Sequence, residues 1–151
     1  MRIIPASVTT IVLVAALSSC GAQGPDSGYC KDLKASRSDL ESSQTSGLAG
    51  LGKQITTIHR LADSAPDEVA GDWKKLDAAT LSIDRALSKA GLKASDLANI
   101  QKGKIPSGVT QSDLQAVAKA FAGMSKPRLA EASTKIRKNA NDVCHVPLGE
   151  F

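Results

Sequence analysis

The side chains best able to carry chemistry are three thiols and two imidazoles, at Cys20, Cys30, Cys144, His59 and His145. Thiols can be acylated, cross-linked or bound to a metal, and imidazoles can transfer protons or bind a metal. A zinc site would draw on both types, but the adjacent Cys144 and His145 lack CxxC or HxxxH spacing and would point about 100° apart on a helix. The sequence therefore predicts no metal site.

Acid–base catalysis would depend on His59, which lies beside an apolar stripe containing Ile55 and Ile58. A hydrolase would pair this imidazole with a nucleophile and an orienting carboxylate. Sequence spacing places no serine or cysteine as that nucleophile, so we interpret His59 as a surface histidine at the polar edge of a helix. The prediction is that the protein is not an enzyme, the alternative being an active site whose residues assemble only in space.

Residues 47–54 (GLAGLGKQ) nearly match the phosphate-binding loop G-x₄-G-K-[ST]. The match fails at Gln54, which stands where the motif needs a hydroxyl for Mg²⁺. Residues 41–46, which precede it, are polar and cannot form the buried strand that the motif requires. We interpret the segment as a glycine-rich entry to a helix.

Two clusters of charge could bind ions or charged partners. The acidic one lies on a single connection, mostly complements a helix dipole, and has neither the spacing of a calcium loop nor two carboxylates across a cleft. The basic one lies along the last predicted helix and has three interpretations: a solvated face, a contact with anionic headgroups, or a site for an acidic cell-wall polymer. The acidic residues are Asp63, Asp67, Glu68 and Asp72, and the basic residues are Lys126, Arg128, Lys135, Arg137 and Lys138.

The N-terminal 19 residues have the layout of an export signal. A basic start (MR) precedes an uncharged apolar stretch at 3–17 that is too short to span a bilayer. The LSSC sequence at 17–20 then resembles the lipobox of bacterial lipoproteins. The resemblance implies cleavage after Ser19 and a covalent diacylglycerol on Cys20. Two acyl chains make membrane anchoring stable.

Cys30 and Cys144 remain once Cys20 is acylated. An even number of thiols in an oxidising compartment indicates a disulfide, and free thiols are the alternative. The two residues lie near opposite ends of the mature chain. In the loop-entropy model, a bridge closing a loop of about 100 residues contributes about 4.7 kcal/mol.

The elements that must position these residues are helices. Apolar residues recur at three- and four-residue spacing and no segment alternates with period two, which predicts an all-α fold. We expect four main helices in an up-and-down bundle stapled by one disulfide, with Trp73 in the core. The boundaries are a signal peptide at 1–19, a lipidated cysteine and flexible tether at 20–28, a helical bundle at 29–146, and an extended or loose tail at 147–151. The expected helices cover about 29–40, 48–64, 66–90 and 111–144, the last interrupted or kinked at 123–127.

Charge and aromatic content bear on whether the protein binds nucleic acid. The net charge of +4 comes from 19 basic and 15 acidic residues scattered along the chain, and there are only one Trp, one Tyr and two Phe among 151 residues. With so few aromatic residues, we do not expect the chain to belong to the class of domains that stack nucleic-acid bases on aromatic rings. No nucleic-acid partner is expected.

The complete pattern resembles the small Ala- and Asp-rich lipoproteins of high-GC Gram-positive bacteria. It consists of the lipobox, Tyr29-Cys30-Lys31-Asp32-Leu33, the turn at 65–69 (APDEV) with Trp73 behind it, and the closing Cys144. The resemblance implies anchoring to the outer leaflet of the cytoplasmic membrane and supplies no activity. We expect a membrane-anchored, extracytoplasmic and non-enzymatic module that binds an envelope protein or a cell-wall component. The alternative is a carrier or sensor of a small apolar ligand held within the helical bundle.

Overall fold

The computed structural model describes residues 24–151, so the predicted signal peptide at 1–19 and Cys20 lie outside the described residues. Within this range 75% of the residues are helical and none is in a strand, which confirms the all-α prediction. The elements are α1 (Gly28–Leu40), α2 (Ser42–Ser46), η1 (Gly47–Ala49), α3 (Leu51–Ser64), α4 (Asp67–Lys89), η2 (Ala94–Asp96), α5 (Leu97–Ile100), α6 (Gln111–Ala122), η3 (Gly123–Ser125) and α7 (Pro127–Asp142).

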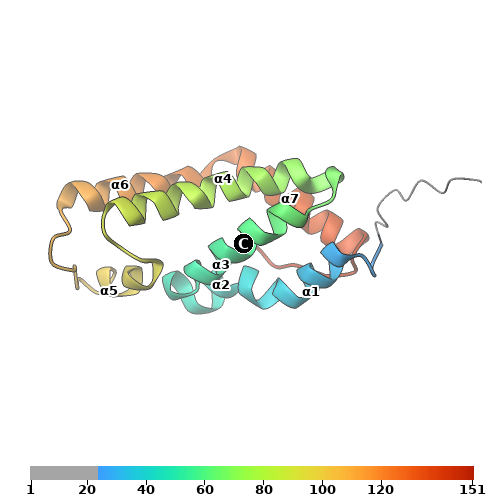
Figure 1. Ribbon diagram of the computed structural model, residues 1–151, viewed down its shortest axis with the longest axis horizontal. Coiled ribbons are helices and arrows are strands. Elements are labelled where there is room, and N and C mark those ends of the chain that lie inside the picture. Colours follow the sequence, from blue (N-terminus) through green and yellow to red (C-terminus); the bar gives the residue numbers. More distant parts are fainter. Residues whose placement is uncertain (1–23) are drawn as a thin grey trace, which may run out of the picture.

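The long helix α4 organises the molecule. It contacts α3 as well as both α6 and α7, and α1 packs against α3. Figure 1 shows α6 beside the C-terminal half of α4 and α7 beside its N-terminal half. The segment expected to be helical at 111–144, with an interruption or kink at 123–127, is interrupted: two helices are joined by η3, because Pro127 begins a new helix.

Local capping interactions define two of the helix ends. The Ser27 hydroxyl accepts from the Cys30 N–H at 3.2 Å and begins α1. Helix α4 ends before Gly91, whose φ of +67° lies in the left-handed region. The Leu92 N–H then donates to the Leu87 carbonyl at 2.9 Å, a Schellman-type termination.

The apolar core has two clusters, one toward each end of α4. The first surrounds Trp73, which is fully buried as predicted and donates from Nε1 to the Tyr29 hydroxyl at 2.9 Å. The second includes Ile83 and Leu87 of α4 and Val117 of α6. Helix α4 therefore contributes side chains to both clusters.

The C-terminal segment, expected to be extended or loose, is extended and packs on the domain. Val146 is buried, and Leu148 and Phe151 pack on the first core cluster. The Phe151 ring stacks on Trp73 with centroids 6.1 Å apart. The Gly149 N–H donates to the Glu41 carboxylate at 2.7 Å, so apolar burial and a charge-assisted hydrogen bond together hold the tail on the domain.

Candidate functional site

The two cysteines of the described chain form the predicted disulfide, with Cα atoms of Cys30 and Cys144 5.1 Å apart. Both residues are buried, and the bond joins the first turn of α1 to the segment just after α7. The alternative of free thiols is therefore wrong. The bridge links α1, which packs mainly on α3, to the end of α7, which packs mainly on α4.

His59 has a carboxylate partner that the sequence did not reveal. Its Nδ1 lies 3.0 Å from Oδ1 of Asp77 on the neighbouring helix α4, and its side chain is 53% exposed. The hydrogen bond and negative charge of Asp77 raise the pKa of His59 above its usual value, and the charge of Asp63 adds to this effect.

His145 lies elsewhere, next to Cys144, with a left-handed φ of +54°. Within residues 24–151 no three His, Cys, Asp or Glu side chains gather in a way that could hold a metal ion.

The glycine-rich segment at 47–54 packs against the end of α1 and α2. Ser42 donates from its hydroxyl to the Gly50 carbonyl at 2.8 Å, and a Cβ added at Gly50 would overlap the Ser42 carbonyl. Gln54 is buried and donates to the Leu40 carbonyl at 2.9 Å. The glycine thus allows close backbone approach and the glutamine satisfies the end of α1, which agrees with the interpretation as a helix entry.

The acidic cluster is divided among different structural tasks. Asp67 and Glu68 occupy the first turn of α4, where carboxylates complement the helix dipole. Asp72 is buried and accepts from the Lys75 ammonium at 2.6 Å. Asp63 lies near the end of α3 and acts on His59 through its charge. Among these four residues, no two carboxylates therefore face each other across a cleft.

The basic residues of the last segment do not share one face. Arg137 lies 3.8 Å from Glu150 of the tail, and Lys138 is paired with a carboxylate within α7. Lys126 and Arg128 instead lie at the start of α7, facing α4. The single basic face considered in the sequence is therefore resolved into separate groups.

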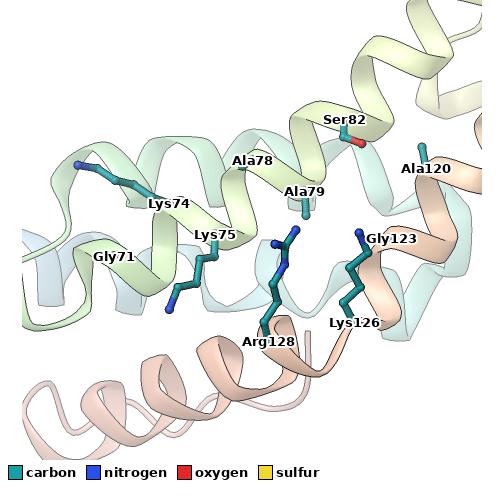
Figure 2. Close-up of a pocket in the computed structure, with 10 residues that line it drawn as sticks. All are labelled: Gly71, Lys74, Lys75, Ala78, Ala79, Ser82, Ala120, Gly123, Lys126 and Arg128. Carbon is teal, nitrogen blue, oxygen red and sulfur yellow. The ribbon is translucent and has the colours of Figure 1, made fainter.

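A basic groove of about 370 Å³ lies between α4 and the α6–α7 link. We use this name for the hollow lined by Lys74, Lys75, Lys126 and Arg128 over a floor of glycines and alanines. Figure 2 shows Lys126 and Arg128 reaching toward α4, with Lys75 extending toward α7 and Lys74 pointing away. Sequence reasoning missed the two lysines of α4. The two lysines directly follow Trp73 and are exposed, which could have indicated a basic surface. That this surface faces Lys126 and Arg128 follows only from the packing of α4 on α7.

An apolar cavity of about 340 Å³ lies between η1, α5 and α6, beside the second core cluster. Its lining is aliphatic and aromatic, with Gln101 as the one amide side chain. The lining residues are Leu48, Leu92, Leu97, Ile100, Gln101, Leu114, Val117, Ala118 and Phe121. The hollow is thus at the end of the molecule that carries α5, away from the disulfide (Figure 1).

None of the helices within residues 24–151 combines the length and apolar character needed to cross a bilayer. Comparison of the chain with protein-family models, curated proteins and solved structures finds no significant match.

Proposed function

We propose that this chain is a lipid-anchored, extracytoplasmic protein of the cell envelope whose helical domain is a non-enzymatic binding module. The observation that carries the proposal is the LSSC sequence ending at Cys20, directly after a signal-like segment. The buried Cys30–Cys144 bridge supports it, since structural disulfides belong to oxidising compartments. The resemblance to small lipoproteins of high-GC Gram-positive bacteria points to the outer leaflet of the cytoplasmic membrane.

We describe the helical domain, within this proposal, as a four-helix up-and-down bundle in which α6 and α7 together form the fourth element. The packing of α1 on α3, of α3 on α4, and of α4 on α6 and α7 supports this description. The disulfide connects the first element to the end of the last. Such a bundle presents its surfaces to a partner.

The placement of the titratable groups favours binding over catalysis. His59 has a carboxylate partner in Asp77, as a catalytic imidazole would, but among residues 24–151 no serine or cysteine is hydrogen-bonded to it. Neither His59 nor Asp77 lines the basic groove or the apolar cavity. The two hollows are instead suited to hold an anion and an apolar group, respectively.

The anchoring is tested by labelling cells with a radioactive fatty acid and recovering the protein. Wild type should be labelled and Cys20→Ala unlabelled, because the thioether cannot form without the thiol. Gln23→Ala, a change three residues further along, is the matched control and should be labelled as wild type. An unlabelled wild type, or a labelled Cys20→Ala variant, would contradict the proposal.

A second candidate function is a carrier or sensor of a small apolar ligand, favoured by the apolar cavity. Its volume of about 340 Å³ falls within the range of small-molecule sites, about 300–1,000 Å³. A fluorescent apolar probe should bind saturably, and Ala118→Leu should weaken binding at least tenfold by filling the cavity. Ala116→Leu, on the same helix but outside the cavity lining, is the control. Non-saturable partitioning, or equal weakening by both variants, would rule this function out.

A further inference from the structure

We propose that the basic groove binds the phosphate groups of an anionic polymer, and this inference rests on the proposed binding function. Three basic side chains, those of Lys75, Lys126 and Arg128, meet at the groove from segments about fifty residues apart in the sequence, while Lys74 lines its edge and points away. Lys75 is partly neutralised by Asp72, at 2.6 Å. In the part of the chain that the structure describes, Lys74, Lys126 and Arg128 have no carboxylate within ion-pair distance.

The unpaired charges make an anion favourable in the groove. Like charges held near one another repel, and an anion between them replaces that repulsion by attraction. A guanidinium such as that of Arg128 can donate two parallel hydrogen bonds to one phosphate, whereas the ammonium of Lys126 acts as a point charge. The two side chains are close in sequence and both reach toward α4 in Figure 2.

The N-terminus of α7 adds positive potential at the same place. Lys126 is the N-cap of this 16-residue helix, its side chain makes no capping bond, and the first turn holds no acidic residue. Helix α4 differs, since its first turn contains Asp67 and Glu68. Pro127 has no N–H and the Leu129 N–H donates to the Lys126 carbonyl at 2.9 Å, so the contribution of this helix end is the positive end of its dipole, beside Lys126 and Arg128.

The shape of the groove favours a polymer over the headgroups of a bilayer. The floor is made of small residues such as Ala78 and Gly123, so a ligand can approach the helix backbones closely. Lys126 and Arg128 point across the recess toward α4 instead of outward. A flat membrane reaches protruding cations best, while a flexible phosphate chain can enter a recess between two helices.

The test is calorimetric titration of the purified full mature protein, in mild detergent, with inorganic polyphosphate at fixed ionic strength. The doubly substituted Lys126→Gln/Arg128→Gln protein should bind at least tenfold more weakly than wild type. Lys119→Gln/Lys135→Gln removes the same charge from exposed positions outside the groove and should change affinity less than twofold. Equal losses in the two double variants, or no binding by wild type, would overturn the assignment.

A second variant tests whether weaker polyphosphate binding could result from unfolding of the protein. Ala78→Glu leaves all four cations in place but puts a carboxylate at an exposed position on the groove floor. It should also weaken polyphosphate binding at least tenfold, with the helical circular dichroism of wild type. Wild-type affinity in this variant would contradict the proposed site.

Vesicles containing phosphatidylglycerol distinguish the two sources of phosphate. Wild type should bind polyphosphate more tightly than the vesicles, per phosphate, and the reverse order with the same dependence on Lys126 and Arg128 would overturn the polymer assignment. The fatty-acid label on Cys20 is independent of this groove. Failure of phosphate binding is therefore distinguishable from failure of the proposed anchoring.

Discussion

Removing the Cys30–Cys144 disulfide should lower the free energy of unfolding by about 5 kcal/mol. The bond joins residues 114 positions apart. The loop-entropy model gives about 16 cal/mol/K for such a loop, or about 4.8 kcal/mol at 25 °C. Because single domains are stable by about 5–15 kcal/mol in total, the reduced protein should be close to marginal stability. The effect is large because the bond closes a long loop, and in this model the entropy that the cross-link removes from the unfolded chain grows with loop length.

The assay is urea unfolding followed by helical circular dichroism. Oxidised wild type is compared with wild type in a reducing agent and with Cys30→Ala/Cys144→Ala, which controls for the reagent because it has no bridge to reduce. Both unbridged forms should unfold at much lower urea concentration, and the reducing agent should leave the double variant unchanged. A loss below about 1 kcal/mol in both forms would refute the reasoning and show that helix packing alone holds the ends of the chain together.

Three further predictions concern single contacts. Asp77→Asn should lower the pKa of His59, measured by NMR titration of the imidazole; because this pKa is raised in the folded state, the stabilisation is present below about pH 6.5 and is lost as pH rises through the folded value. An unchanged titration would exclude the pair. Tyr29→Phe leaves the buried Trp73 Nε1 without its acceptor and should lower the free energy of unfolding, measured in urea, by about 1–3 kcal/mol. An unchanged free energy of unfolding would show that this hydrogen bond does not stabilise the fold. Gly50→Ala should lower the melting temperature, because its Cβ overlaps a backbone carbonyl, and an unchanged temperature would disprove that close approach.

Features that depend on local sequence were predictable. The start of α4 can be predicted from Pro66 and the acidic residues after it. Its end can be predicted from Gly91, because glycine, which has no Cβ, adopts the left-handed φ at little steric cost. The disulfide could be predicted from the number of thiols, without knowledge of the fold. The burial of Trp73 followed from its place in an apolar stripe of helical spacing.

Features that depend on which helices meet were not predictable in this way. Asp77 becomes the partner of His59 only because α3 packs on α4. Lys75 joins Arg128 at the basic groove only because α7 packs on α4, and no local pattern specifies that pairing. The sequence leaves open whether the tail is extended or loose, and Phe151 is held in place by contact with Trp73, which is distant in sequence.

The central claim, a lipid anchor at Cys20, is tested most directly by mass spectrometry of the N-terminal peptide of the protein isolated from its own membranes. We expect a mature chain that begins at Cys20 and carries the mass of a diacylglycerol on that residue. A peptide that retains residues of the 1–19 segment, or begins at an unmodified Cys20, would contradict it.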